Sequence, residues 1–414
     1  MHTQQAGLSK LLPLLAGRLP DTDQTIQRVL FAIRTHLGMD VAFISEFVGT
    51  DRVFRQVDAA GWTPIYPGDS TLLETGYCQR VVDGRLPGLI PDTMALPAAV
   101  ALHETLATPI GAHMSVPIRL GDGRIYGTFC CFGFVPNETL NERDLEMMQA
   151  FADLIAGQLE LDMNSSRERQ GKIQRIEMAI QHGGPSIVFQ PIYRLEDNRC
   201  VGVECLSRFH TAPQISPDVW FAEAADVGLG QALELCAISK ALAALDALPP
   251  DLYLAINASP ATILSNKLAP LFEGIEAERI VLELTEHAHA ADYDQLLQIL
   301  KPMRSRGVRI SIDDAGTGYS SMRHILSVQP DIIKLDVGLT RGMDHDPTRH
   351  ALTAALIEFA RQTGSSILAE GVETASELTS LRTLGASKAQ GYFLSHPLSL
   401  DDTIQCARSA TSFH

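Results

Sequence analysis

The sequence predicts an α/β protein of two domains, the second of which is a closed barrel of alternating strands and helices. At 414 residues the chain is longer than one hydrophobic core usually supports. From residue 187 onward, short apolar runs alternate with longer stretches of helical periodicity. Because eight such runs occur, a closed barrel is favoured over an open sheet. The expected strands cover residues 187–195, 201–206, 252–257, 280–285, 308–313, 331–336, 366–369 and 386–393.

The N-terminal domain is expected to be an α+β domain with a central antiparallel sheet. Apolar residues recur at helical spacing over residues 24–36, and strand-like runs follow. The segment Gly121-Asp122-Gly123 is a hairpin signal between the last two of these runs. The expected strands are 41–47, 52–58, 114–119 and 125–132.

An amphipathic helix is expected over residues 141–160, where Asn141, with Asp144 three residues later, is a plausible cap. Its apolar residues recur at steps of three and four. They are Leu145, Met148, Phe151, Ile155 and Leu159. Residues 161–172 are polar and rich in charge, and the apolar stripe resumes at Ile173 and Ile176. We therefore expect domains at 20–160 and 173–414, joined by a helical linker at 161–172.

Polar residues occur at the ends of the expected strands of the second domain. Asp313 and Asp314 are adjacent at the end of one run and precede a glycine-rich turn. Two buried carboxylates side by side repel each other strongly unless cations lie nearby. The other polar residues at strand ends are Glu204, Asn257, Glu283, Lys334 and Glu370. One such carboxylate can be a mere cap or salt-bridge partner, but five carboxylates and one amide at one end of a barrel predict a site for two divalent cations.

Composition and charge exclude several classes of partner. A hydrophobic content of 45% with 20% charged residues is typical of a soluble globular protein. The formal charge of −16 argues against electrostatic binding to duplex DNA or anionic lipid. A small phosphorylated ligand can still bind through metal ions. No apolar run has the length of a membrane span, and the N-terminus lacks a secretory signal pattern. We expect a cytoplasmic protein without nucleic-acid or membrane partners.

The seven cysteines are an odd number and lack the paired spacing of a zinc site. They are Cys78, Cys130, Cys131, Cys200, Cys205, Cys236 and Cys406. We expect reduced and mostly buried thiols, with a redox-sensing role for Cys130-Cys131 as the alternative.

Residues 173–414 resemble the EAL-domain phosphodiesterases that hydrolyse cyclic di-GMP, whose fold is a TIM-like (β/α)8 barrel. The signature tripeptide is Glu204-Cys205-Leu206, with cysteine in place of the usual alanine. The other matching motifs, in chain order, are Asn257-Ala258-Ser259, Glu283-Leu284-Thr285-Glu286, Asp313-Asp314-Ala315-Gly316-Thr317-Gly318, Ile333-Lys334-Leu335-Asp336, Glu370-Gly371-Val372-Glu373 and Gln390-Gly391-Tyr392.

The resemblance implies a role for each site residue. Two ions, Mg²⁺ or Mn²⁺, would be bound, and a water between them would attack the phosphodiester with Lys334 orienting it. Arg208 and Gln390 would contact the substrate, Arg208 because its planar fork suits a phosphate. Glu204, Asn257, Glu283 and Asp313 would hold one ion, and Asp313, Asp314 and Glu370 the other.

Several residues near the motifs are expected to have structural roles. Glu286 and Glu373, each three residues after a proposed site glutamate, would hold neighbouring loops rather than bind metal, and Glu286 resembles the family residue that anchors the loop from Asp313 to Ser320. Cys205 should matter little, because it points to the face opposite Glu204 on a strand. Ala315 stands where phenylalanine is commoner, which leaves the regulation through this loop open. His287, His289 and His396 match no ligand pattern and are expected to be ordinary loop residues.

Residues 20–160 resemble a GAF sensory domain, with 77–82 and 115–118 near its usual motifs. The residue set of cyclic-nucleotide-binding members is absent, and Cys78 lacks the following histidine common in bilin-binding ones. An unknown small molecule is therefore the expected ligand, and a domain that only dimerises is the alternative.

We expect metal-dependent hydrolysis of cyclic di-GMP to linear pGpG in bacterial second-messenger signalling, regulated by the GAF domain. The alternatives are a non-catalytic cyclic di-GMP receptor, which usually loses metal ligands, and an unrelated barrel hydrolase, which would not explain the ordered motifs. The apolar stripe of residues 145–176 predicts a homodimer, with the helix between the domains transmitting the state of the sensor.

Overall fold

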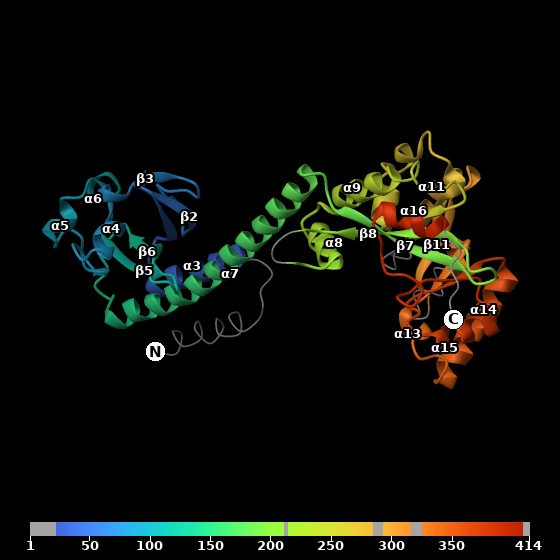
Figure 1. Ribbon diagram of the computed structural model, residues 1–414. Coiled ribbons are helices and arrows are strands. Elements are labelled where there is room, and N and C mark those ends of the chain that lie inside the picture. Colours follow the sequence, from blue (N-terminus) through green and yellow to red (C-terminus); the bar gives the residue numbers. More distant parts are fainter. Residues whose placement is uncertain (1–21, 211–213, 285–292, 316–324, 409–414) are drawn as a thin grey trace. The chain divides into compact units, whose positions relative to one another are not determined.

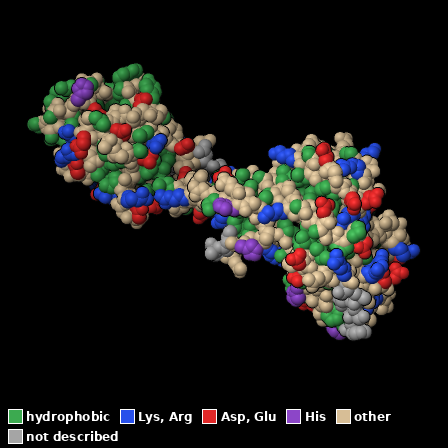
Figure 2. Space-filling view, turned by 45° about the horizontal axis from the view of Figure 1, so that its top comes forward, with side chains coloured by type: hydrophobic (Ala, Val, Ile, Leu, Met, Phe, Trp, Pro, Cys, Tyr) green, Lys and Arg blue, Asp and Glu red, His purple; other side chains and the backbone are tan. Residues whose placement is uncertain are grey.

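The computed structural model describes residues 22–210, 214–284, 293–315 and 325–408, and within these not the side chains of Tyr293, Asp314 and Ala315. The chain divides into two compact units, Met1–Glu168 and Arg169–His414 (Figure 1). On the face that Figure 2 shows, acidic and basic side chains are interspersed over both units. No helix within the described ranges is both long and apolar enough to cross a membrane.

The N-terminal unit contains the expected antiparallel sheet, with strand order β3-β2-β1-β6-β5-β4. The strands are β1 (Val41–Val48), β2 (Asp51–Ala59), β3 (Ser70–Leu72), β4 (Leu89–Ile90), β5 (Ala112–Arg119) and β6 (Ile125–Gly133). The hairpin between β5 and β6 is confirmed, and Gly123 there has the positive φ of 83° that such a turn requires. The two short edge strands β3 and β4 carry too little pattern to be found in the sequence.

Hydrophobic clusters cover both faces of this sheet. One cluster joins α3 (Thr22–Leu37) and the first turns of α7 (Glu142–Gln181) to residues such as Ile44 and Cys131. The other contains Phe43 and Cys130 and covers the opposite face, because neighbouring residues of a strand point to opposite sides. Three short helices lie on this second side: α4 (Tyr77–Val82), α5 (Pro97–Val100) and α6 (His103–Ala107).

The helix α7 runs without a break through residues 161–172, from Glu142 to Gln181. Met148, Phe151 and Ile155 are buried against the sheet of their own unit, and Phe151 is only 6% exposed. Ile176 is buried in a separate cluster with Trp220 of the second unit. The most deeply buried residues of the stripe therefore belong to intramolecular cores, and the homodimer stays a prediction.

The second unit is a closed barrel of eight strands, as expected, in the order β10-β11-β12-β13-β14-β7-β8-β9. Its first four strands are β7 (Ser186–Arg194), β8 (Cys200–Arg208), β9 (Tyr253–Ala258) and β10 (Ile280–Leu284). The other four are β11 (Arg309–Ala315), β12 (Ile332–Leu335), β13 (Ser366–Ala369) and β14 (Lys388–Ala389). The main helices around it are α8 (Pro217–Asp226), α9 (Gly230–Leu242), α11 (Tyr293–Ser305), α14 (Pro347–Thr363), α15 (Ala375–Leu384) and α16 (Leu400–Arg408).

One strand departs from the uniform (β/α)8 pattern. β7 is antiparallel to both of its neighbours, β8 and β14. The connection from Arg194 to Cys200 is too short for a parallel crossover, which needs a dozen or more residues. It turns through Asn198, whose φ of 56° is left-handed. The beginning of β7 therefore lies at the same end of the barrel as the carboxyl ends of the other strands.

Candidate functional site

The barrel interior has an apolar layer followed by a polar layer. The apolar layer is Ile192, Tyr253, Ala255, Val281, Ile332 and Leu368. Every second residue of a strand faces the same side, so the residue two positions after a member of the apolar layer lies in the polar layer. This step leads from Val281 to Glu283, from Ile332 to Lys334 and from Leu368 to Glu370.

The strand register brings the site residues to the same level. Glu283 on β10 pairs with Asn257 on β9 and with Ser311 on β11. Asn257 is half-buried beside it. Asp313 lies two residues beyond Ser311, on the same face and nearer the end of the barrel.

Lys334 is the centre of the polar layer. Its Nζ lies 2.7 Å from Glu370 Oε1 and 3.1 Å from Glu283 Oε2. It also lies 3.2 Å from Asp313 Oδ1 and 3.3 Å from Glu204 Oε1. The side chains of Lys334 and Glu283 are each only 1% exposed. The structure therefore brings together five of the residues that the sequence singled out, although these come from five different strands or strand ends.

The charges of this cluster shift the pKa values of its members. Burial opposes ionisation of Lys334, but the four carboxylates raise its pKa well above the ordinary value. Burial likewise opposes ionisation of Glu204, whereas the Lys334 ammonium and a hydrogen bond from Gln390 hold the pKa of Glu204 low. For Glu283, burial and the neighbouring carboxylates raise the pKa well above the usual range, and for Glu370 they raise it to about 8. One ammonium is thus too little positive charge for four carboxylates.

Gln390 connects two of the carboxylates. Its Nε2 donates to Glu204 Oε2 at 2.6 Å and to Glu370 Oε1 at 3.2 Å. The next residue is Gly391, where a Cβ would lie 2.2 Å from the backbone N and O of Val372. Glycine there lets the chain after β14 approach the chain after β13 closely enough for these bonds to form. The Gln390 Oε1 atom is buried and has no hydrogen-bond partner, so it is free to accept a bond from a ligand or water.

Two polar residues near the site were missed in the sequence. Gln190, on the antiparallel strand β7, pairs with Glu204 and donates to Ser395 O at 3.3 Å. Glu234 Oε2 accepts bonds of 2.9 Å from the backbone and the hydroxyl of Ser259, just beyond Asn257. A polar residue inside an otherwise apolar run was the available signal for Gln190. No local pattern distinguishes Glu234 from other helical glutamates.

Glu377 holds the same loop as Glu373, for which a loop-anchoring role is predicted. Glu373 is exposed and forms an ion pair with Arg341. Glu377 is buried, and its carboxylate accepts bonds from the backbone N of Gly342 at 2.8 Å and of Glu373 at 2.9 Å. It thereby joins the loop after β13 to the segment after α13 (Val337–Thr340). The sequence signal was the capping box formed by Thr374 and Glu377.

The guanidinium of Arg208, expected to contact a substrate phosphate, bonds to the backbone instead. Arg208 ends β8 and uses Nη1 to donate to Ser207 O at 2.8 Å. The side chain of Asp314, as well as Glu286 and most of the loop from Asp313 to Ser320, lies outside the described residues.

The donor set has the chemistry that divalent cations require. Within the ranges that the structure describes, no three acidic, histidine or cysteine side chains form a ready metal-binding group, because the carboxylates surround Lys334. Four carboxylates around the single ammonium of Lys334 leave an excess of negative charge in the cluster. Hard carboxylate and amide oxygens suit Mg²⁺ or Mn²⁺, so the residues fit such ions.

Comparison with known proteins agrees with this geometry. A sequence model of the EAL domain matches residues 173–397, which is more than half of the chain, and a model of the GAF domain matches residues 21–159. A solved structure described as the PaMucR phosphodiesterase in complex with c-di-GMP is 27% identical and superposes with a TM-score of 0.51. The match covers 56% of this chain and 99% of that one.

Two curated relatives are longer than this chain. An uncharacterised signalling protein of Caulobacter vibrioides is 30% identical over 88% of this chain and 45% of its own length. The bifunctional diguanylate cyclase and cyclic di-GMP phosphodiesterase MucR of Pseudomonas aeruginosa is 29% identical over 58% of this chain and 37% of its own length. The chain therefore spans less than half the length of these relatives.

Proposed function

Because the chain belongs to the EAL domain family, we propose that it hydrolyses one phosphodiester bond of cyclic di-GMP and releases linear pGpG. The observation that carries this proposal is the convergence of Glu204, Glu283, Asp313 and Glu370 on Lys334 at one end of the barrel. The description of MucR as a cyclic di-GMP phosphodiesterase supports the choice of substrate.

We infer that two divalent cations, Mg²⁺ or Mn²⁺, take part. Glu204, Asn257, Glu283 and Asp313 would hold one of them, and Asp313, Asp314 and Glu370 the other. When bound, such ions lower the pKa of a water molecule and neutralise charge on the phosphoryl oxygens.

The protein's own groups supply positioning. Lys334 is held on several sides by carboxylates, so its ammonium keeps a fixed direction. It would donate a hydrogen bond to the attacking water or a phosphoryl oxygen in place of one of these carboxylate contacts. Gln390 restrains the carboxylates of Glu204 and Glu370 through its amide nitrogen. Arg208, at the end of β8, would turn its planar guanidinium to a substrate phosphate.

The test is turnover of cyclic di-GMP by the purified full-length protein, with pGpG quantified by chromatography. We expect hydrolysis with Mg²⁺ or Mn²⁺ and none after chelation. Calcium should inhibit, because its longer oxygen distances make a bound water less acidic. Protein that binds cyclic di-GMP but forms no pGpG with either metal would overturn the enzymatic proposal in favour of a non-catalytic receptor.

We further propose that the N-terminal domain is a sensor of a small molecule that regulates hydrolysis, and that the protein works as a homodimer in bacterial second-messenger signalling. Comparing turnover by the full-length protein with that of a truncated protein starting at Lys172 tests the regulation. Equal rates at every protein concentration would contradict it.

A further inference from the structure

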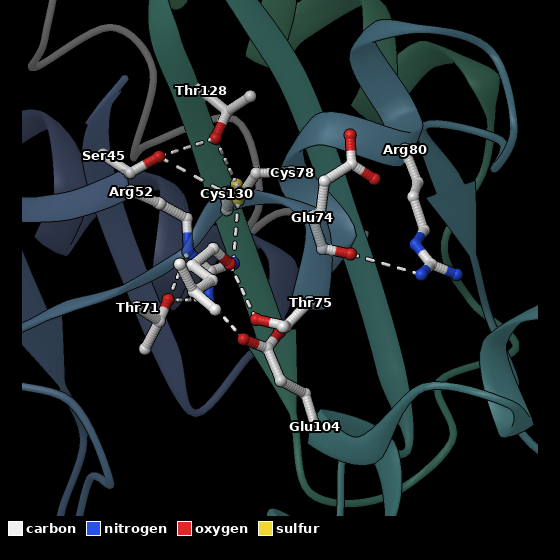
Figure 3. A network of polar contacts seen from close by, with 11 residues as sticks. Ser45, Arg52, Thr71, Glu74, Thr75, Cys78, Arg80, Glu104, Thr128 and Cys130 are labelled. Atoms are coloured by element: carbon white, nitrogen blue, oxygen red, sulfur yellow. Dashed lines mark hydrogen bonds and ion pairs between the residues drawn. The ribbon is translucent and has the colours of Figure 1, made fainter. Parts of the chain in front are cut away.

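Two cysteines of the N-terminal unit lie side by side in its interior. The sulfur atoms of Cys78, on α4, and Cys130, on β6, are 3.5 Å apart, and both residues are fully buried (Figure 3). They are 52 residues apart in the chain. Nothing in the proposed phosphodiesterase mechanism uses them.

A buried arginine faces the first of these cysteines. Arg52 Nη1 donates to Cys78 Sγ at 3.2 Å, and the residue is only 3% exposed. Its Nη2 donates to Thr71 Oγ1 at 2.9 Å and also forms an ion pair with Glu104. Thr71 is exposed and the Glu104 side chain is 23% exposed, so a chain of polar contacts leads from the surface through Arg52 to Cys78 (Figure 3).

Hydroxyl groups surround the second cysteine. Cys130 Sγ lies 3.1 Å from both Ser115 Oγ and Thr128 Oγ1, and Ser45 Oγ lies 2.9 Å from Thr128 Oγ1. The register of the sheet brings these groups together, because Ser115 pairs with Cys130 and Ser45 pairs with Thr128. The hydrogen bonds satisfy the polar atoms inside an otherwise apolar cluster.

The two sulfurs differ in their tendency to ionise. Burial opposes ionisation of Cys78, but the hydrogen bond from Cys130 and the charge of Arg52 lower its pKa to about 6. For Cys130, burial and the neighbouring Cys78 raise the pKa well above the usual range. One thiolate beside one thiol is the arrangement from which a disulfide can form.

Cys131 is a natural contrast to Cys130. It is the next residue on β6, but it points to the opposite face and packs among apolar side chains. Burial there raises its pKa well above the usual range of a thiol. The pair Cys130-Cys131, which the sequence offered as a redox candidate, is therefore divided between two faces of the sheet, and the structure gives Cys130 a different partner.

We propose that Cys78 and Cys130 form an oxidisable dithiol, which a hydroperoxide converts into a reversible disulfide. The Cys78 thiolate attacks one peroxide oxygen, the O–O bond breaks, and Cys78 becomes a sulfenic acid. The oxygen that leaves takes up the proton that Cys78 lost when it ionised. Cys130 sulfur then attacks the Cys78 sulfur, the S–O bond breaks, and the departing hydroxide takes up the Cys130 proton as water. With hydrogen peroxide, the two thiols lose two electrons and two protons, and the peroxide is reduced to two water molecules.

The experiment maps thiols in the full-length wild-type protein. The reduced protein is treated with stoichiometric hydrogen peroxide at neutral pH, unfolded, alkylated, digested and analysed by mass spectrometry. We expect a cross-linked Cys78–Cys130 peptide that dithiothreitol removes, while Cys131 and Cys205 stay alkylated. If Cys78 and Cys130 remain reduced, or if oxidation falls on the less buried Cys200, Cys236 and Cys406 instead, the proposal is wrong.

Matched variants separate this chemistry from general oxidation. In Cys130→Ser, Cys78 should accumulate as a sulfenic acid that dimedone traps, whereas Cys131→Ser should form the disulfide at the wild-type rate. Arg52→Gln should slow oxidation at pH 7 at least about tenfold, because each unit of increase in the thiol pKa removes up to about nine-tenths of the thiolate. Equal yields of a disulfide that contains Cys78 in Cys130→Ser and Cys131→Ser would refute Cys130 as its partner. The thiol map of the wild-type protein decides the question even where a variant folds poorly.

Discussion

Lys334 Nζ lies 2.7 Å from Glu370 Oε1, the closest of its four carboxylate contacts, and joins the end of β12 to the chain just after β13. The Lys334 side chain is almost wholly buried, so the pair is shielded from solvent. The Lys334 ammonium therefore holds four carboxylates together at the end of the barrel.

Lys334→Met should reduce cyclic di-GMP turnover at least about tenfold and destabilise the barrel. Removing one partner of a buried ion pair typically costs about 3–5 kcal/mol, because the remaining charges are left uncompensated. Turnover and thermal unfolding measure the two effects. Lys388→Met is the matched control, since Lys388 begins β14 at the opposite end of the barrel, where it lies over the Tyr253 ring at 5.6 Å. Its turnover should stay within about twofold of wild type.

Asp313→Asn and Glu204→Ala should each leave less than about a tenth of the wild-type turnover. Loss of a metal ligand removes several kcal/mol of transition-state stabilisation. The control is Glu373→Gln, which removes an exposed ion pair with Arg341 worth roughly 0–1 kcal/mol. A metal-saturated Asp313→Asn protein with near wild-type turnover would contradict the proposal that Asp313 holds both ions.

Stability of the N-terminal unit should fall with acid through His113. This residue is buried and stacks on Tyr77 with ring centroids 4.2 Å apart, and burial together with the charge of Arg52 lowers its pKa to about 3. An unfolded histidine titrates near pH 6.5, so the contribution of neutral His113 is complete above that pH and is lost progressively as pH falls towards 3. The expected slope is up to about 1.4 kcal/mol per pH unit.

Calorimetry at pH 7 and pH 5 checks this dependence. His113→Gln should flatten it, whereas His103→Gln, at an exposed position of α6, should not. The same pH dependence in both variants would show that another group is responsible.

The homodimer remains a prediction, and the structure changes how it is tested. Because Phe151 lies in the core, Phe151→Asp should destabilise the N-terminal unit by about 3 kcal/mol or more, whatever the oligomeric state. Leu154 and Leu161 are 51% and 66% exposed and lie seven residues apart on α7, and so on one side of it. Leu154→Asp should therefore lower the dimer content in light scattering while preserving stability. A monomeric wild-type protein at micromolar concentration would refute the prediction.

The sequence by itself determined the barrel and the identity of the residues at its polar end. Alternation along a strand is a local property, so Val281 and Glu283 had to face the same side, as did Ile332 and Lys334. The strand count then favoured closure, and the observed closure brings the carboxyl ends of the parallel strands together. The antiparallel direction of β7 was missed, although the short link from Arg194 to Cys200 contained the signal.

Only the tertiary structure decided which distant residues meet. The partners of Glu377 and Glu234 lie in other loops, and Cys78 on the helix α4 meets Cys130 on the strand β6, so no periodicity links them. It also decided that the first part of the α7 stripe packs on the N-terminal sheet and Ile176 packs in the second unit, because an amphipathic pattern records that a face is buried but not what covers it. Such contacts are set by strand register and by packing between remote segments. Register and packing depend on the whole fold rather than on residues that are neighbours in the sequence.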